Sequence, residues 1–227
     1  MPRPTLSRRH FIVAAPLALA ACTARGDRAP MALIDPEQAQ WAAMYGAVQD
    51  GPFEVPAVDI SQIDPQFLRR EVAYPTREPA GTIVVDPNQR FAWLVLGNGR
   101  AIRYGVGVGR EEGFNFRGEA TIARKAEWPR WTPTPNMIAR EPERYGPYAG
   151  GMDGGLDNPL GARALYLYRD GRDTYYRLHG TVEPTTIGTM VSSGCVRFIN
   201  QDIIDLHRRV PTGSRVVVRP ASGTPAV

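Results

Sequence analysis

Short apolar segments separated by turn residues recur through the middle and end of this 227-residue chain. Residues 82–86 are rich in β-branched side chains, and turn sequences at 87–89 and 97–99 separate them from two further apolar segments. Apolar segments of this length, joined by Pro, Gly and Asn, are typical of antiparallel hairpins. The expected strands span residues 82–86, 90–96, 100–107, 119–124, 163–168, 174–178 and 214–219. The pattern therefore predicts a mostly β domain.

Two segments have the features of short amphipathic helices. The first begins at Asp35-Pro36, where the aspartate can cap the helix and the proline fits the first turn, and we expect it to end near residue 48. The second begins at Asn200, which we expect to cap it, with Asp202 in the first turn. Its predicted buried stripe comprises Ile203, Leu206 and Val210.

Two other regions are weakly patterned and rich in Pro or Gly. Residues 51–80 are expected to form an extended Pro-rich arm, with one helical turn near residues 65–69. Residues 128–158 are expected to form a long loop. A loop of that length within a compact domain usually has a function.

The first 22 residues have the features of an export signal. A twin-arginine start at Arg8 and Arg9 precedes an apolar run at residues 11–21, which is too short to anchor the chain across a bilayer. The run ends in the sequence LAAC, which resembles a lipobox, so we expect Cys22 to be lipidated. Cleavage after Ala20, which would leave a soluble periplasmic protein, is the alternative.

The chain is therefore predicted to have four parts. They are an export signal of the twin-arginine type with a lipobox at residues 1–21, a tether and Pro-rich arm with a short helix at 22–80, the β domain at 81–220, and a tail at 221–227.

The placement of cysteine and histidine is the main chemical signal in the sequence. The chain contains two cysteines and three histidines, and once Cys22 is lipidated or removed, Cys195 is the remaining thiol. In an oxidising export compartment, such a thiol is either buried and inert or kept for its reactivity. His179 ends an alternating segment upstream, and a nearby imidazole favours the reactive thiolate. A small buried cysteine and a hydrogen-bonded core histidine are the alternatives.

The residues just before Cys195 suit chemistry at a carbonyl group. Gly194 permits a tight turn and a close approach of the backbone to a substrate, while Ser192 and Ser193 add hydroxyl groups. Backbone N–H groups near Gly194 and Cys195 can hold the oxyanion of a tetrahedral intermediate.

Charge and ligand counts argue against nucleic-acid binding and against a metal site. Residues 1–21 hold three arginines and no acidic residue, so the rest has 27 − 3 = 24 basic and 23 acidic side chains, a net charge of +1. A nucleic-acid-binding protein would need a larger basic surplus. A zinc site needs three or four ligands, but His10 leaves with the export signal and His207 lies in the last predicted helix.

Several motifs occur together in an order that resembles one enzyme family. They are Trp128-Pro129 with Trp131 and Pro133, Asn158-Pro159-Leu160-Gly161, His179-Gly180-Thr181, Ile187-Gly188, Ser192-Ser193-Gly194-Cys195-Val196-Arg197, and Asn200 with Asp202, Leu206 and Gly213. As a set they resemble the L,D-transpeptidase family with its YkuD-type catalytic domain, over about residues 81–219. The resemblance implies an L,D-transpeptidase-like β-sandwich or barrel with one helix after the catalytic cysteine, preceded here by the Pro-rich arm.

The resemblance also implies a two-step acyl transfer. Cys195 is implied as the nucleophile that attacks the meso-diaminopimelate carbonyl of a peptidoglycan stem tetrapeptide and releases D-Ala. His179 is implied as the base, oriented by a backbone carbonyl near Gly180. An amine acceptor would give a 3→3 cross-link or attach a protein to the wall, whereas water would make the chain an L,D-carboxypeptidase.

Further site residues are implied with less detail. Arg197 is assigned to site structure or to binding of a substrate carboxylate, and Trp128 and Trp131 are expected to flank the cleft. Many members of the family have histidine where this chain has Ser193, a difference that changes the polarity around the thiol.

The expected partners are peptidoglycan stem peptides, an outer-membrane protein or lipoprotein as acceptor, and a membrane through the lipid on Cys22. No nucleic acid, metal or organic cofactor is expected, and the predicted location is the periplasm. A non-catalytic wall-binding lipoprotein and a secreted cysteine peptidase are the alternatives in other functional classes.

Overall fold

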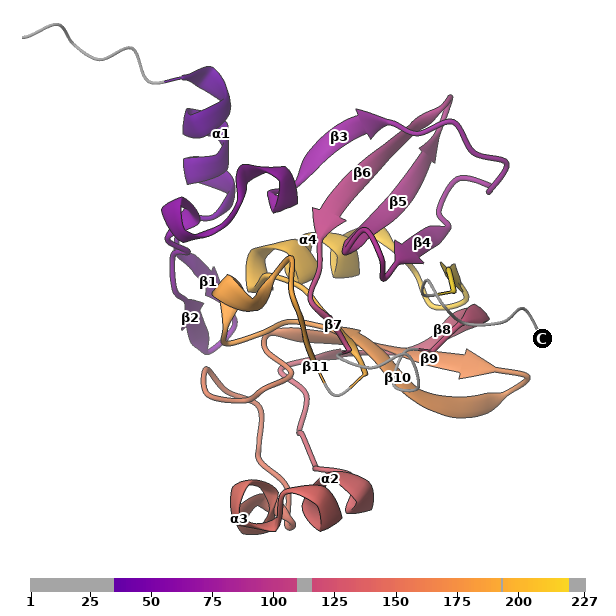
Figure 1. Cartoon of the computed structure of the whole chain (residues 1–227). Helices are drawn as coiled ribbons and strands as arrows, with labels where there is room; N and C mark the ends of the chain where they lie inside the picture. The colour runs from indigo at the N-terminus through magenta and orange to yellow at the C-terminus, as the bar shows by residue number, and fades with distance from the viewer. Residues whose placement is uncertain (1–34, 110–115, 193, 221–227) are drawn as a thin grey trace, which may run out of the picture. The chain divides into compact units, whose positions relative to one another are not determined.

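A nine-stranded mixed sheet organises the residues that the computed structural model describes, which are 35–109, 116–192 and 194–220 (Figure 1). Most neighbours are antiparallel, but β10 and β12 form a parallel pair, as do β13 and β4. In spatial order the sheet contains β12 (Val196–Arg197), β10 (Arg172–His179), β9 (Arg163–Arg169), β8 (Gly118–Glu127), β13 (Arg215–Val218), β4 (Ile83–Asp86), β5 (Phe91–Gly97), β6 (Arg100–Gly105) and β3 (Arg70–Ala73).

The main hydrophobic core lies between this sheet and α4 (Asn200–Arg209). Leu165 and Leu178 project from neighbouring strands into it, and Ile203 and Leu206 project from the helix, all fully buried. Because Leu178 points into this core, its strand neighbour His179 points to the opposite face of the sheet. The period of the strand thus decides which side chains are available for a surface site.

The N-terminal segment packs against the sheet and contributes a second core. Its elements are α1 (Pro36–Met44), β1 (Val48–Asp50), β2 (Phe53–Val55), the 3-10 turns η1 (Ile60–Gln62) and η2 (Pro65–Phe67), and β3. Trp41 and Phe67 from this segment pack with Phe91 and Trp93 of β5. Residues 35–80 are therefore continuous with the β domain through shared apolar burial.

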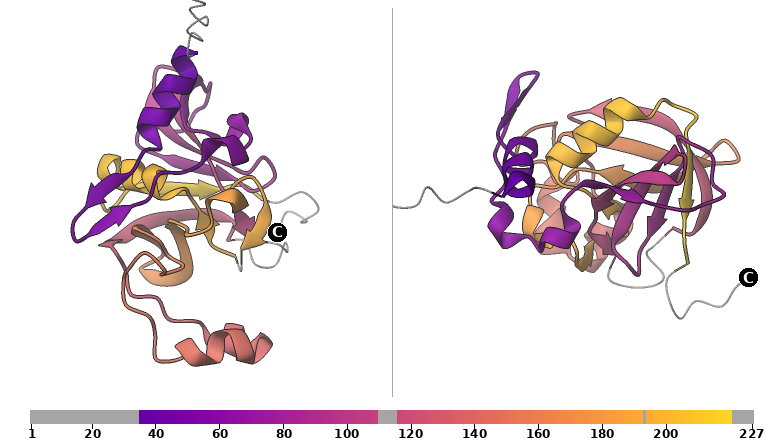
Figure 2. Two further views of the ribbon diagram at one scale, coloured as in Figure 1. Left: turned by 90° about the vertical axis from the view of Figure 1, so that its left-hand side faces the viewer. Right: turned by 90° about the horizontal axis from the view of Figure 1, so that it is seen from above.

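A helical loop (residues 128–160) leaves the end of β8 and returns at β9. It carries α2 (Pro135–Arg140), α3 (Pro142–Tyr145) and the 3-10 turn η4 (Gly146–Tyr148). Both figures place α2 and α3 across β9 and β10 from α4 (Figures 1 and 2). The remaining elements are the parallel pair β7 (Val108–Gly109) and β11 (Met190–Ser192), and the 3-10 turn η5 (Pro184–Thr186).

The structure confirms the mostly β fold and all seven strands expected from the apolar pattern, with shifts of up to three residues at their ends. The helix after Cys195 is also confirmed, with its predicted buried stripe. The first helix begins as expected but ends at Met44, and the expected loop at 128–158 contains two short helices.

Several sequence-based expectations fall on residues outside the described part of the chain. They are the export signal, Cys22, Ser193 and the tail at 221–227. Within the described residues, none of the helices has both the length and the apolar character needed to span a membrane.

Candidate active site

The register of two parallel strands brings the cysteine and the histidine to one face of the sheet. Leu178 of β10 pairs with Val196 of β12, and His179 pairs with Arg197. The first pair is buried in the main core, so the second pair faces the other way. Cys195 comes directly before β12, and it lines the same cavity as His179 and Arg197.

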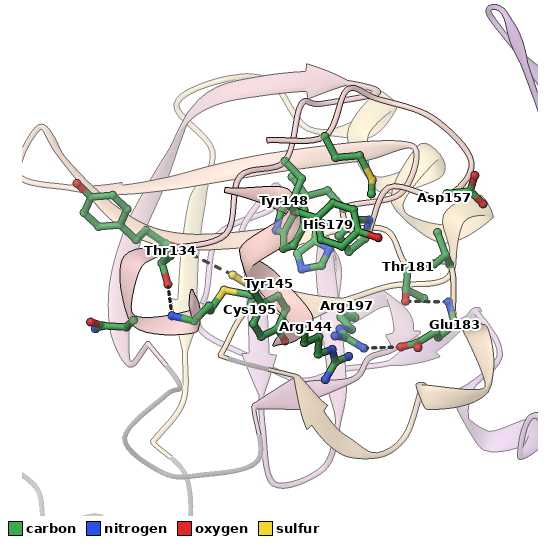
Figure 3. Close-up of a pocket in the computed structure, with 18 of the residues that line it drawn as sticks. Thr134, Arg144, Tyr145, Tyr148, Asp157, His179, Thr181, Glu183, Cys195 and Arg197 are labelled. Carbon is green, nitrogen blue, oxygen red and sulfur yellow. Dashed lines mark hydrogen bonds and ion pairs between the residues drawn. The ribbon is translucent and has the colours of Figure 1, made fainter. Parts of the chain in front are cut away.

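This face forms the floor of a cavity of about 570 Å³, which His179, Cys195 and Arg197 all line (Figure 3). The helical loop forms the opposite wall. Sequence separation alone could not establish this proximity, since fifteen intervening residues can take many paths. The structure brings the two side chains to one opening, with the thiol partly exposed.

An irregularity in β10 shapes the cavity beside the thiol. The pairing of β10 with β9 shifts register between Asp173 and Arg177, and Tyr175 within this bulge has a φ of 61°. The Cys195 thiol donates a hydrogen bond to the Tyr175 carbonyl, with an S···O distance of 3.8 Å. On the other side of the cysteine, Gly194 has a φ of 127°, a conformation that disfavours other residues.

The orientation of His179 is set by a single backbone acceptor. Its Nδ1 lies 2.6 Å from the Gly180 carbonyl oxygen. Because a carbonyl only accepts, Nδ1 carries the proton and Nε2 keeps the lone pair. The buried ring therefore presents Nε2 as the atom that can take a proton. Nδ1 is held by a backbone carbonyl instead of a carboxylate.

Electrostatics in this pocket favour a neutral thiol beside a neutral imidazole. Desolvation by burial, aided by the Arg197 charge, lowers the pKa of His179 to about 4, although the Gly180 carbonyl opposes the shift. Desolvation raises the pKa of the Cys195 thiol, and the Arg177 backbone amide opposes this. The sequence led us to expect a thiolate, whereas both pKa shifts favour the neutral forms of these two groups.

Asn200 holds the backbone beneath His179. Its Oδ1 accepts a hydrogen bond from the Ala162 N–H at 3.0 Å. A Cβ atom at either Gly161 or Gly180 would collide with that oxygen, so both positions require glycine. The prediction that Asn200 caps α4 is wrong, because Ile199 is the cap residue and the asparagine oxygen bonds across to the start of β9.

The helical loop supplies an aromatic wall to the cavity. Trp131 packs against Tyr145 and Tyr148, with ring centroids 6.2 Å and 5.9 Å apart, and all three residues line the cavity. Figure 3 shows the two tyrosines. Mutual backbone hydrogen bonds between Trp131 and Met152 join the two legs of the loop. This wall therefore has its own internal packing.

Trp128 lies elsewhere, although the sequence paired it with Trp131. Its ring packs on Phe53 of β2, 4.4 Å between centroids, and its indole N–H donates to the Asp50 carbonyl at 3.2 Å. It thus fixes the N-terminal segment to the base of the helical loop. Of the serines, Ser192 lies in β11, in register with Gly109 of β7.

Sequence analysis missed four charged residues that line the cavity, Arg140, Arg144, Asp157 and Glu183. Glu183 Oε2 forms an ion pair with Arg197 Nη1 at 3.1 Å. Arg144 extends from α3 of the helical loop (Figure 3). The only available signals were weak: Glu183 follows His179 by four residues, and Arg144 lies in a loop too long to be a simple connection.

No cluster of metal-ligating side chains is present in the described residues. The polar groups that line the cavity include one thiol, one imidazole, several charged groups and the hydroxyl groups of Thr134 and Thr181. A thiol and an imidazole together can carry out nucleophilic attack with proton transfer.

A family model described as the L,D-transpeptidase catalytic domain, YkuD, matches residues 80–218. Among curated relatives, "Probable L,D-transpeptidase ErfK/SrfK" of Escherichia coli (strain K12) is 40% identical over 115 residues, which cover 50% of this chain and 35% of that protein. "Probable L,D-transpeptidase YbiS" of the same strain is 32% identical over 152 residues, covering 66% of this chain and 47% of the relative. The chain therefore spans less than half the length of these two relatives.

A solved structure from Brucella melitensis, titled "Probable carnitine operon oxidoreductase caia", is 48% identical and covers 74% of this chain and 98% of its own. Its TM-score is 0.48, too low for this likeness to carry an argument about the fold or activity of this chain.

Proposed function

Because the chain belongs to the L,D-transpeptidase family, we propose that it is a cysteine-dependent acyltransferase that acts on peptidoglycan stem peptides. The observation that carries the proposal is the shared cavity of Cys195 and His179, in which the Gly180 carbonyl fixes the ring so that Nε2 can accept a proton. The donor is a stem tetrapeptide with meso-diaminopimelate at its third position.

In the first half-reaction, the Cys195 sulfur attacks the diaminopimelate carbonyl while its proton passes to Nε2 of His179. The tetrahedral intermediate then expels the D-Ala nitrogen, which takes the proton from the imidazolium. The products are free D-Ala and a thioester on sulfur. The low pKa of His179 suits this step, because a weakly basic imidazole gives its proton readily to the leaving amine.

In the second half-reaction, an amine attacks the thioester carbonyl. His179 takes a proton from the attacking nitrogen and returns one to the departing sulfur. A diaminopimelate amine gives a 3→3 cross-link, a lysine side chain attaches a protein to the wall, and water gives L,D-carboxypeptidase activity. The open side of the cavity, beyond the helical loop, is where we expect the acceptor to enter.

The proposed site of action is the periplasm, where Cys22 would tether the chain to a membrane by its lipid. The twin-arginine start and the LAAC sequence support this location. Mass analysis of the mature N-terminus tests it: a lipid-modified cysteine as first residue is expected, and an unmodified chain beginning at Ala21 would contradict it.

The decisive test of activity is incubation of the full chain with a purified disaccharide tetrapeptide, with the products identified by mass. We expect release of D-Ala together with a cross-linked dimer, and no product with the Cys195→Ala variant. Release of D-Ala without a dimer would indicate the carboxypeptidase. Binding of the muropeptide without any D-Ala release would instead indicate a non-catalytic wall-binding module, and cleavage of ordinary L-peptides would indicate a cysteine peptidase.

A further inference from the structure

Three charged side chains from three separate elements line the cavity beside the cysteine and histidine. They are Arg144 of α3, Glu183 of the segment between β10 and η5, and Arg197 of β12 (Figure 3). None of the three is needed to explain how sulfur attacks a carbonyl. Their position next to the reacting groups therefore requires another explanation.

Glu183 and Arg197 form the fixed part of this trio. The Arg197 Nη1 lies 3.1 Å from Glu183 Oε2, and the arginine side chain is 19% exposed whereas the glutamate is 55% exposed. The Glu183 N–H donates to the Thr181 hydroxyl at 3.1 Å, so the backbone below the carboxylate is held in place. Since Arg197 also pairs in register with His179, this ion pair lies directly beside the catalytic imidazole.

Arg144 reaches the same region from the opposite wall. Its guanidinium pairs with Glu141 at 3.2 Å and is 62% exposed. The hydrogen bond with Glu141 raises the pKa of Arg144, and Glu183 adds a weaker attraction in the same direction. The Glu183 carboxylate thus lies within electrostatic reach of guanidinium groups from both walls (Figure 3).

Both arginines keep capacity for a ligand. Arg144 pairs with Glu141 and Arg197 pairs with Glu183, each through Nη1. A guanidinium group has five N–H donors, so each arginine can also bind the carboxylate of a ligand. The partly exposed Glu183 carboxylate can at the same time accept hydrogen bonds from an ammonium group.

We propose that Glu183, together with Arg144 and Arg197, binds the free α-amino-acid end of the diaminopimelate side chain in the donor stem peptide. Glu183 accepts from the ammonium group, and the two arginines bind the carboxylate beside it. The trio thereby selects diaminopimelate over lysine, whose side chain carries an amine but no carboxylate. This inference rests on the proposed function for the identity of the donor.

The terminal D-Ala of the donor does not fit the trio as well. Its carboxylate would satisfy an arginine, but its nitrogen is acylated and carries no charge, so Glu183 would gain no partner. Only the side-chain end of diaminopimelate presents an ammonium and a carboxylate on one carbon atom. Glu183 lies within electrostatic reach of both arginines, so it can accept from the ammonium group while the arginines bind the carboxylate.

Equilibrium binding to the full chain carrying Cys195→Ala tests the inference without turnover. The probes are four synthetic stem tetrapeptides with, at the third position, meso-diaminopimelate, its side-chain N-acetyl derivative, its side-chain amide, or lysine. Calorimetry is expected to give a Kd about tenfold weaker for each of the three altered peptides than for the first, the usual cost of one charge-assisted contact. Equal Kd values for all four, or no binding of the first, would overturn the inference.

A second substitution assigns the contact to Glu183. In the same background, Glu183→Gln is expected to weaken binding of the diaminopimelate peptide about tenfold and to leave binding of the N-acetyl peptide unchanged within twofold. Asp157→Asn removes the same charge from the same cavity, and it should preserve the preference for diaminopimelate. Equal weakening of both peptides by Glu183→Gln would mean that Glu183 only positions Arg197, and would contradict the assignment.

Failure of this inference can be told apart from failure of the proposed function. Thioester formation by the unaltered chain on both the diaminopimelate and the lysine donor, with equal Kd values, would remove the inference and leave the function. Selective binding of the diaminopimelate peptide without thioester formation would do the reverse.

Discussion

The candidate active site and a buried polar seam both depend on α4, yet they use buried ionisable groups in opposite ways. The seam comprises Tyr45, Arg69, Tyr104, Asp202 and Asp205, and joins the N-terminal segment to the helix and the sheet. In the seam, polar groups are largely closed to solvent and pair with one another, although Asp202 Oδ1 has no hydrogen-bond partner and lies 3.6 Å from Arg69 Nε. In the active site, polar groups lie at an open cavity with capacity left for a substrate.

The contacts of the seam illustrate the closed arrangement. The Tyr45 hydroxyl donates to Asp202 Oδ2 at 3.1 Å and accepts from the Arg69 backbone N–H at 2.7 Å. The Tyr104 hydroxyl donates to Asp205 Oδ2 at 2.8 Å, and the Arg69 guanidinium lies 3.0 Å from the same carboxylate. Each of these bonds joins residues distant in the sequence, so the seam fixes the N-terminal segment in one position.

Desolvation acts in both regions, but with different consequences. In the seam, burial raises the pKa of Asp202 to about 7, against the influence of Arg69 and the Tyr45 hydrogen bond. In the active site, burial lowers the pKa of His179, which keeps the imidazole neutral and able to accept a proton. The same physical cost therefore limits stability in one place and prepares a base in the other.

The largest effect is expected from Cys195→Ala, which should remove acyl transfer without loosening the fold. Loss of a nucleophile lowers turnover by a factor on the order of 10⁶, below detection in this assay. The thermal midpoint should stay within about 2 °C, because the side chain is small and partly exposed. D-Ala release by the variant, measured by mass, would remove the nucleophile assignment.

His179→Gln is expected to lower acyl transfer by a factor of about 10² to 10⁴, the usual contribution of a general base. In the unaltered chain, the rate should fall as the pH drops through about 4, where the ring becomes protonated and can no longer accept a proton. The variant should lack this acid limb. Rates of thiol alkylation that are equal in both proteins near pH 7 would argue against the pairing.

Asn200→Ala should disturb both regions at once, because the residue belongs to α4 and supports the backbone under His179. Loss of the bond to the Ala162 N–H should lower the free energy of unfolding by about 1–3 kcal/mol. We also expect acyl transfer to fall several-fold as Gly180 moves. Urea denaturation and D-Ala release measure the two effects, and a change in stability alone would show that Asn200 does not position the histidine.

Asp202→Asn should affect the seam and leave the active site unchanged. The folded-state pKa of Asp202, about 7, lies above the unfolded value of 3.8, so its contribution to stability is complete below 3.8 and is lost as the pH rises through about 7. The unaltered chain should therefore lose on the order of 4 kcal/mol across this window. The variant should lose less of its free energy of unfolding over the same pH range, and its rate of Cys195 alkylation should be unchanged. An identical pH dependence of unfolding in the two proteins would contradict this account.

The sequence predicted features that depend on local patterns. Short apolar segments rich in β-branched residues identified the strands, and the apolar stripe of Ile203, Leu206 and Val210 identified α4. The order of motifs around His179 and Cys195 led to the two residues that now share a cavity. In each case the signal lies within a few neighbouring residues.

Features that depend on distant partners were not predictable in the same way. Asp202 was interpreted as a first-turn residue favoured by the helix dipole, but its hydrogen-bond partner Tyr45 lies 157 residues away. Asn200 was expected to cap its own helix and instead bonds to Ala162. The side chains of the edge strand β3 alternate between partly buried and exposed. Its sequence did not predict a strand, and its hydrogen-bonded pairing with β6 is what makes it one.

The central claim is that the Cys195 sulfur forms a thioester with the acyl group of the donor. The most direct test is to locate that thioester. The full chain is incubated with the diaminopimelate tetrapeptide, quenched in acid, digested and mapped by mass. We predict a mass increase equal to the donor minus D-Ala on the peptide that contains Cys195. D-Ala release with no adduct on that peptide, or with the adduct on Cys22, would contradict the account.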